Sequence, residues 1–245
     1  AHAEVFRVPQ RPEKGFIIDF ADIPADVARR ARLMIVSYPN NPTTAVAPPS
    51  FYDDLVAFAK DNDIFVIHDN AYSELTFDGL RVGSFLAHKG AKDIGAEFNS
   101  LSKTYGYAGA RLGFCLGNAD YIAALKQVKS NTDYGVFLPV QRGGIRALMC
   151  DDSVIRATAA EYEQRRDILI RAFADVGWAI TPPKATMFVW AKTPDAWPDD
   201  VEFAKMLMRK AGVIVVPGSA FGDLGKGYVR IALVQDKERI EEAAR

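Results

Sequence analysis

The sequence is poor in cysteine and histidine, and it has no long apolar run. Only two cysteines, Cys115 and Cys150, and three histidines occur among its 245 residues, and neither cysteine has the spacing of a metal-ligand motif. We therefore expect no disulfide framework and no metal site, as in a reducing compartment. No run approaches the roughly 18 apolar residues of a transmembrane helix, and no basic-then-apolar leader opens the chain. These features predict a cytoplasmic protein without a membrane partner.

The chain also lacks an excess of charge of either sign. It has 30 basic and 31 acidic residues, and the two signs are interspersed. Such a balance provides neither the electrostatic footprint of a nucleic-acid-binding protein nor a polybasic membrane patch. With 49% hydrophobic and 25% charged residues, the composition is typical of a globular protein that forms one large domain or two modest ones.

Strands and helices alternate in the first part of the chain. Apolar runs at 33–38, 64–68 and 97–101 predict buried strands, and a helix with Ser50 as its N-cap lies between the first two. Strand–helix–strand units with continuously apolar strands indicate an α/β fold, with a mostly parallel sheet covered by helices. The strand at 110–116 follows a loop too short for a parallel crossover, so we expect it to run antiparallel to its predecessor.

The pattern changes after one long helix, predicted over 151–176 and ended by Gly177. Beyond it come short strands and helices in an α+β arrangement. The expected strands are 187–190, 213–216 and 228–233, and the expected helix is 201–211. We therefore place a domain boundary near Asp151, with a large domain at 1–150 and an interdomain helix plus a small C-terminal domain at 151–245.

Polar side chains follow each of the three predicted parallel strands. They are Asn41, then Asp69 and Tyr72, then Ser100 and Lys103. In open α/β sheets ligands bind at the carboxyl ends of the strands, so these groups should converge on one crevice. An amine in such a crevice can act as a nucleophile toward carbonyls once its pKa is lowered.

Each of these residues also has an ordinary structural explanation. Lys103 could be a solvated surface lysine, Asp69 could cap a turn, Asn41 could form an Asx-turn before a proline, and Tyr72 could be a core residue with a satisfied hydroxyl. We interpret His68 as structural, because neighbouring residues on a strand point to opposite faces and His68 precedes Asp69.

Taken together, the motifs resemble a known family. Asn41-Pro42-Thr43, Asp69-x-Ala71-Tyr72 and Ser100-x-x-Lys103 with Arg111 downstream, followed by Gly227-Tyr228-Val229-Arg230, resemble the pyridoxal-phosphate (PLP) site of fold-type I, class I/II aminotransferases. The segments 129–137 and 183–190 are similar to the subgroup of LL-diaminopimelate and alanine aminotransferases. The resemblance is to the C-terminal portion of such an enzyme. It implies a partial PLP-binding large domain, with the glycine-containing phosphate loop and the ring-stacking aromatic residue upstream of Ala1.

The resemblance implies a role for each residue around the cofactor ring. Lys103 would form a Schiff base with the PLP aldehyde and carry the proton between the substrate Cα and the cofactor. Asp69 would pair with the pyridine nitrogen and keep it protonated. Tyr72 and Asn41 would form hydrogen bonds to the phenolic oxygen of the ring.

The remaining residues implied by the resemblance bind anionic groups. Ser100 and Arg111 would hold the cofactor phosphate, with Ser102 as a lesser candidate. Arg230, together with Asn41, would bind the substrate α-carboxylate, although an arginine on a strand could also pair with a nearby acid.

The implied activity is transfer of an amino group between an L-amino acid and a 2-oxo acid, in a homodimer with shared active sites. Two alternatives stay open: a PLP-dependent C–S lyase, and the aminotransferase-like effector-binding domain of a transcription regulator. One position departs from the family pattern. Thr44 stands where the family usually has glycine, and we expect its side chain to disfavour a positive φ angle.

Overall fold

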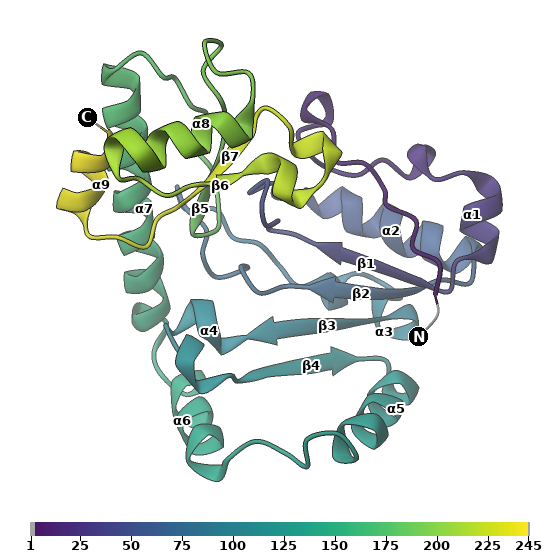
Figure 1. The fold of residues 1–245 in the computed structure, drawn as a ribbon. Helices are drawn as coiled ribbons and strands as arrows, with labels where there is room; N and C mark the ends of the chain where they lie inside the picture. The colour runs from purple at the N-terminus through teal and green to yellow at the C-terminus, as the bar shows by residue number, and fades with distance from the viewer. Residues whose placement is uncertain (1–2, 245) are drawn as a thin grey trace.

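The computed structural model of the chain describes residues 3–244. The described residues form a four-stranded sheet with the order β1-β2-β3-β4 and a three-stranded sheet with the order β5-β7-β6. Figure 1 shows the first sheet in the centre, the second sheet near its upper left end, and the long helix α7 on the same side. No helix in this part of the chain is long and apolar enough to cross a bilayer.

The first sheet confirms the predicted mostly parallel arrangement with one reversed strand. Strands β1, β2 and β3 are mutually parallel, and β4 pairs antiparallel with β3. Their bounds are Leu33–Ser37, Phe65–Asp69, Gly95–Ser100 and Gly113–Gly117. The prediction that the last strand begins at residue 110 was wrong. A 3-10 turn ends at Ala110, and Arg111 has a left-handed φ of 55°, which a strand does not accommodate.

Short and medium helices precede, connect and follow these strands. They are α1 (Ala25–Arg30), α2 (Pro49–Asp61), α3 (Ala91–Ile94), α4 (Leu101–Thr104), α5 (Ala119–Ser130) and α6 (Leu138–Leu148). Ser50 is not the N-cap of α2 as predicted. Pro48 occupies that position without a side-chain hydrogen bond, and Pro49 starts the helix because its fixed φ angle suits the first helical turn.

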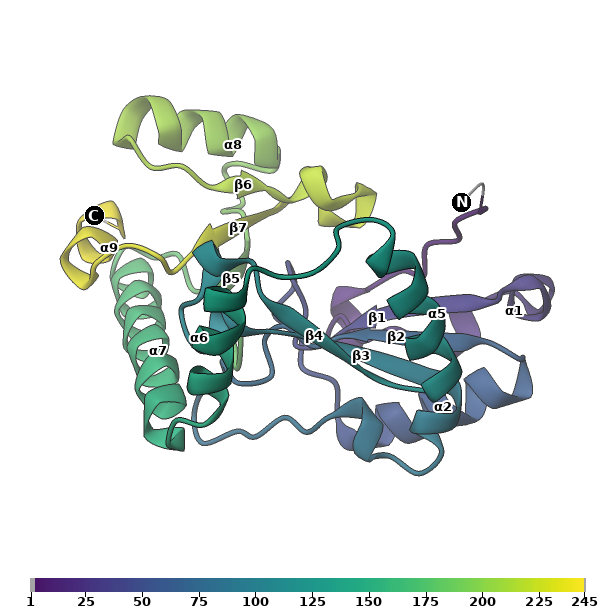
Figure 2. The same ribbon diagram turned by 90° about the horizontal axis from the view of Figure 1, so that it is seen from below.

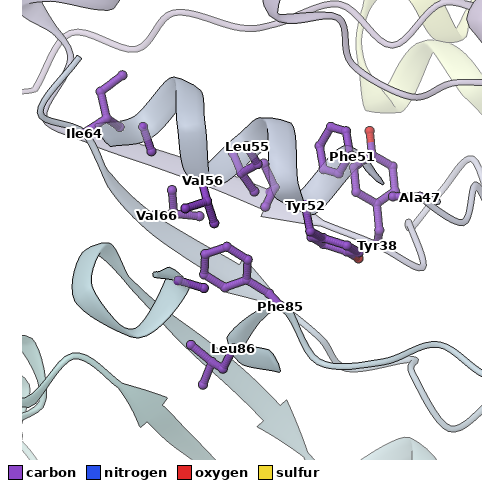
Figure 3. Close-up of a cluster of buried hydrophobic side chains, with 13 residues drawn as sticks. Tyr38, Ala47, Phe51, Tyr52, Leu55, Val56, Ile64, Val66, Phe85 and Leu86 are labelled. Carbon is purple, nitrogen blue, oxygen red and sulfur yellow. The ribbon is translucent and has the colours of Figure 1, made fainter. Parts of the chain in front are cut away.

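The main core of the first part lies between α2 and the sheet. The apolar face of α2 predicted from helical spacing points inward, as the labelled side chains in Figure 3 show. Leu55, Val66 and Phe85 are fully buried, and the ring of Tyr38 packs edge-on against Phe51. This packing fixes β1 and β2, and so the positions of the two loops that follow them.

The opposite face of the sheet is only partly covered by the described residues. Tyr121 of α5 stacks on Phe65 with 4.6 Å between the ring centroids, but Leu33 and Ile35 of β1 are 49% and 66% exposed. Figure 2 shows α2 and α5 on different sides of the strands. A cavity of about 830 Å³ lies between β1 and the segment 3–8. Helices among the described residues thus flank both faces of the sheet, and α2 covers its face more fully than α5 covers the other.

The second part begins with α7 (Asp152–Asp175), whose N-cap Asp151 accepts a hydrogen bond from the Ser153 amide. The remaining elements are β5 (Phe188–Lys192), α8 (Asp200–Met206), β6 (Val216–Pro217), β7 (Tyr228–Ala232) and α9 (Lys237–Ala244). The strand predicted at 213–216 is shorter than expected. Helix α8 continues as a π-helix to Ala211, and the Val213 amide still donates to the Leu207 carbonyl at this helix end.

Two short segments, residues 75–77 of the first part and 184–186 of the second, are joined by backbone hydrogen bonds. The Phe77 amide donates to the Lys184 carbonyl, and the Thr186 amide donates to the Leu75 carbonyl, at 3.0 and 2.8 Å. One buried cluster is built from residues within 36–91, and another is built from residues within 169–244. A third buried cluster, formed by Tyr72, Leu75 and Phe188, lies where the two parts meet. The division near Asp151 stays a prediction.

Candidate active site

The polar residues predicted to converge all follow strands that end at one edge of the sheet. Ser37 of β1 pairs with Asp69 of β2, and Asp69 pairs with Phe98 of β3. In Figure 1 the arrowheads of these strands point toward α4 and the second sheet. The loops after the strands therefore face the second part of the chain.

Asn40 shapes the loop that carries Asn41. The Asn40 side chain is buried; its Oδ1 accepts hydrogen bonds from the amide and the hydroxyl of Thr43 at 3.1 and 2.8 Å, and its Nδ2 donates to the Ser37 carbonyl. Asn40, not Asn41, thus makes the side-chain turn that the sequence offered as an explanation for Asn41. Sequence reasoning missed Asn40, although its place just after a strand and before a proline turn was a signal for it.

Because Asn40 makes this turn, the side-chain amide of Asn41 is free to form a hydrogen bond with a residue far along the chain. Nη1 of Arg230 donates to Asn41 Oδ1 at 2.8 Å, across 189 positions of sequence. Arg230 lies on β7, and its Cζ is 4.3 Å from the ring centroid of Phe188 and 4.8 Å from that of Phe221. Burial lowers the pKa of the Arg230 guanidinium, and the nearby Tyr72 phenol acts in the opposite direction.

Tyr72 connects this arginine to the end of β2. It is 8% exposed, and its ring lies edge-on to Phe188 with 6.0 Å between centroids. Burial raises the pKa of the Tyr72 phenol, and Asp69 adds to this, while Arg230 and a hydrogen bond with Asn41 oppose it. The structure therefore brings Asn41, Asp69, Tyr72 and Arg230 into one electrostatically coupled cluster.

Lys103 and its neighbours lie on α4, the short helix that follows β3 at the same edge of the sheet. Ser100 caps α4, and its Oγ accepts a hydrogen bond from the Ser102 amide at 3.1 Å. Lys103, in the last turn of α4, is partly exposed and forms no hydrogen bond or ion pair with any residue in 3–244. Ser100 pairs with Gly113, which returns the turn bearing Arg111 to this edge. Arg111 is exposed and precedes β4, and its Nη1 donates to the Ala108 carbonyl.

His68 does not belong to this cluster, as the alternation of strand residues predicted. It is fully buried on the α2 face, with Nδ1 3.0 Å from Glu97 Oε2 and Nε2 3.2 Å from the Tyr38 carbonyl oxygen. These contacts tie together β1, β2 and β3 beneath the site. Among the described residues, no group of histidine, cysteine, aspartate and glutamate side chains could hold a metal ion.

Comparison with known proteins places this arrangement in a family. The model of the protein family described as "Aminotransferase class I and II" matches residues 1–245. The chain belongs to this family. The LL-diaminopimelate aminotransferase of Moorella thermoacetica is 48% identical to this chain over 243 residues, which cover 99% of the chain and 62% of that relative. The chain thus spans about three fifths of the length of the curated relatives it matches.

Solved aminotransferase structures share the same fold. BacF from Bacillus subtilis, determined without ligand, is similar with a TM-score of 0.95 and 37% identity, over 98% of this chain and 64% of that one. A probable N-succinyldiaminopimelate aminotransferase from Thermus thermophilus is similar with a TM-score of 0.90 and 38% identity, over 98% and 63% of the two chains. The predicted family and subgroup are thereby confirmed.

The residues of the site fit PLP, the cofactor of this family. Lys103 offers an unpaired amine, and Asp69 offers an exposed carboxylate at the adjacent strand end. The buried Nε of Arg230 has no hydrogen-bond partner, so this guanidinium retains donor capacity after its bond to Asn41. An amine, a carboxylate, a phenol and guanidinium donors at one sheet edge match a ligand with an aldehyde, a basic ring nitrogen, a phenolate and anionic groups.

Proposed function

We propose that this chain is the part of a PLP-dependent aminotransferase that holds the cofactor and the substrate carboxylate, and that the enzyme moves an amino group between an L-amino acid and a 2-oxo acid. The observation that carries the proposal is the hydrogen bond between Arg230 and Asn41. It brings the Arg230 guanidinium of the second part, which would bind the carboxylate, close to Tyr72 at the end of β2, and Tyr72 in turn lies near Asp69. That is the juxtaposition needed to present an amino acid to a cofactor at the strand ends.

When bound, PLP supplies a ring that accepts the electrons released at the substrate Cα. Lys103 Nζ is the atom to which we expect the PLP aldehyde to be attached, and as a free amine it can hold and pass the Cα proton. The Asp69 carboxylate would keep the pyridine nitrogen protonated by a charge-assisted hydrogen bond. Tyr72 and Asn41 would donate hydrogen bonds to the phenolic oxygen.

The anionic ends are assigned to the two arginines and the serine hydroxyls. Ser100 caps the short helix α4, which carries Ser102 and Lys103, and Arg111 follows the 3-10 turn that precedes β4. Ser100, Ser102 and Arg111 would bind the phosphate. Arg230 would bind the α-carboxylate, with Asn41 next to it as the second donor. Since the planar guanidinium can bind a carboxylate bidentately, Arg230 would also orient the Cα relative to Lys103.

The names of the relatives suggest the substrate. We propose LL-diaminopimelate as the first amino donor to test, supported by the 48% identity to an LL-diaminopimelate aminotransferase. The segment 134–137 is the local candidate for contacting the donor side chain. We further propose a cytoplasmic homodimer; the two free cysteines are consistent with a reducing compartment.

Replacement of Lys103 in the full-length protein tests the cofactor assignment. After borohydride reduction, mass spectrometry should find PLP on the peptide that contains Lys103. Lys103→Ala should lose this label and the visible absorption band of the attached cofactor. Lys126→Ala, which changes an exposed lysine on α5, is the matched control and should keep both. A visible band that persists unchanged in Lys103→Ala would disprove the assignment.

A panel of amino donors then tests the reaction class. Spectral change in the half-reaction with LL-diaminopimelate, followed by regain of the original spectrum on adding a 2-oxo acid, is the result expected for an aminotransferase. Steady release of pyruvate and a thiol from cystathionine, without that exchange, would instead identify a C–S lyase.

A further inference from the structure

Phe221 is an aromatic residue beside the site to which neither the motifs nor the proposed function assigns a role. It ends the 3-10 turn Gly218–Phe221, directly after β6. Its ring centroid is 4.8 Å from the guanidinium carbon of Arg230, and Phe188 contacts the same guanidinium at 4.3 Å. Phe188 belongs to β5 and is 8% exposed, in a buried cluster with Tyr72 and Leu75, whereas Phe221 is 40% exposed and is carried by a loop.

The loop that carries Phe221 is held by a buried carboxylate. Asp200, at the first position of α8, is 4% exposed, and its two oxygens accept hydrogen bonds from the amides of Ser219 and Gly227 at 2.8 and 3.2 Å. Burial alone would raise the pKa of Asp200, but these backbone hydrogen bonds outweigh it and leave the pKa below its usual value. An ionised Asp200 therefore fixes both ends of the loop.

The glycines of this loop allow its ends to meet. A Cβ atom on Gly218 would lie only 2.0 Å from the Gly225 carbonyl oxygen. Gly222, which follows Phe221, has φ 125° and ψ 172°, a conformation open essentially to glycine alone. The turn is thus closed on itself, and Phe221 has a defined position above Arg230.

The aromatic contacts matter because few hydrogen bonds restrain the guanidinium. Nη1 donates to Asn41, while Nε is buried without a partner. Rotation of the guanidinium would misalign the donors needed for bidentate recognition of a carboxylate. An aromatic ring over the guanidinium restrains its plane and favours the cation, more strongly where water is excluded.

We propose that Phe221 and Asp200 are positioning residues for carboxylate binding: Phe221 restrains the plane of the Arg230 guanidinium, and Asp200 holds the loop that places Phe221. The inference rests on the proposed function, in which Arg230 binds the substrate carboxylate. Phe221 and Asp200 would thus affect the affinity for substrate through Arg230, without contacting the substrate or the cofactor themselves.

The test uses the full-length, PLP-loaded protein and the half-reaction with LL-diaminopimelate. Phe221→Leu should weaken the apparent Kd about tenfold, the order expected for loss of a partly desolvated cation–π contact, with the rate constant at saturation nearly unchanged. Phe221→Trp should restore affinity. Leu224→Ala, an exposed residue of the same loop, is the control and should bind as the parent does. An unchanged Kd in Phe221→Leu would overturn the role of Phe221.

Arg230→Gln separates failure of this inference from failure of the proposed function. If Arg230→Gln binds LL-diaminopimelate as tightly as the parent, or if the parent does not bind it, the assignment of the carboxylate site fails and the inference falls with it. If Arg230→Gln binds weakly while Phe221→Leu binds normally, only the positioning role fails.

Hydrogen–deuterium exchange supplies a readout that does not depend on activity. In Asp200→Asn, the peptide spanning Ser219–Gly227 should exchange faster, and the apparent Kd should rise as it does in Phe221→Leu. The exchange of peptides from β1 to β3 should stay as in the parent. Faster loop exchange with an unchanged Kd would contradict the link from Asp200 to Arg230, as would a raised Kd with unchanged loop exchange.

Discussion

Thr44 has a φ angle of 62°, although its branched side chain disfavours that conformation. The loop keeps this geometry because the Thr44 amide donates to the Asn40 carbonyl, and the Asn40 amide donates to the Ala45 carbonyl, each at 2.9 Å. The expectation that threonine would disfavour a positive φ at this position is therefore not realised in the fold. The hydrogen bonds around Asn40 impose the turn despite the local cost.

Thr44→Gly should stabilise the protein by about 1 kcal/mol, because glycine adopts a positive φ without a steric penalty. Urea denaturation followed by circular dichroism measures this change. Thr44→Ala, which retains a Cβ atom, should remain close to the parent. A loss of stability in Thr44→Gly would show that the threonine side chain contributes more than its conformation costs.

Glu97 is a second residue whose contribution can be isolated. It is 3% exposed and accepts hydrogen bonds from the Ser84 hydroxyl, the Phe85 amide and the Asn99 side chain, in addition to its contact with His68. Burial by itself would raise the pKa of Glu97, but the hydrogen bonds and His68 outweigh it, and the pKa lies below its ordinary value.

A lowered pKa fixes the sign of the pH dependence. The unfolded chain protonates Glu97 near pH 4.3, so its stabilising contribution is complete above that pH and is lost as the pH falls through the lower pKa of the folded state. Glu97→Gln should cost about 2–4 kcal/mol at pH 7, since it disrupts a buried charged network. Its free energy of unfolding should also fall less steeply than that of the parent between about pH 5 and pH 3.

Equilibrium unfolding at several pH values checks both effects. Glu202→Gln, on the surface of α8 with a side chain 57% exposed, serves as the control and should change stability by less than about 0.5 kcal/mol. A parallel fall of the Glu97→Gln and parent curves on acidification would contradict the assignment of this acid-sensitive stability to Glu97.

At the scale of elements, one arginine joins α7 to the segment that follows Tyr72. Nη1 and Nη2 of Arg166 donate to the two carboxylate oxygens of Asp78 at 2.7 and 2.9 Å, and Nη1 also donates to the Pro183 carbonyl. Arg166 is 3% exposed, and its Cζ lies 4.9 Å from the ring centroid of Phe77. The long helix is thereby attached to both segments that connect the two parts of the chain.

Arg166→Met should destabilise the protein by about 2–3 kcal/mol, because it removes charged hydrogen bonds and leaves a buried carbonyl unpaired. Urea denaturation gives the difference in the free energy of unfolding. Arg156→Met alters an exposed arginine of the same helix, which lies near Asp151 and Asp152, and should change stability by less than about 1 kcal/mol. Equal effects of the two substitutions would rule out a special contribution from Arg166.

The order and direction of the main elements could be predicted from the sequence where one physical rule decided them. Loop length determined the reversal of β4, and strand alternation placed His68 away from Asp69. Element ends were less predictable, because they depend on local turns such as the left-handed Arg111 and on the π-helix that delays β6. Neither feature follows from the spacing of apolar residues.

At the scale of the whole molecule, the motifs identified the residues near the strand ends but not the residues that support them. The hydrogen bond between Asn41 and Arg230 joins positions 189 apart. The resemblance to class I/II aminotransferases implied a role for each of these two residues, but it did not predict the hydrogen bond between them. Phe221 and Asp200 were not identified, because a phenylalanine beside glycine and an aspartate at a helix start are ordinary in sequence. Their significance depends on contacts that exist only after folding.

The stacking of Trp190 on Tyr228, with 5.2 Å between centroids and 2° between ring planes, has a practical consequence. Trp190 also contacts Phe221 and lies opposite Arg230 in the strand register, whereas Trp178 and Trp197 pack in the core of the second part. Because indole emission responds to nearby charge and ring motion, replacing Trp178 and Trp197 by phenylalanine would leave Trp190, on the strand next to that of Arg230, as the one tryptophan of this chain. In such a variant, the emission of Trp190 should change if a carboxylate binds at Arg230 as proposed.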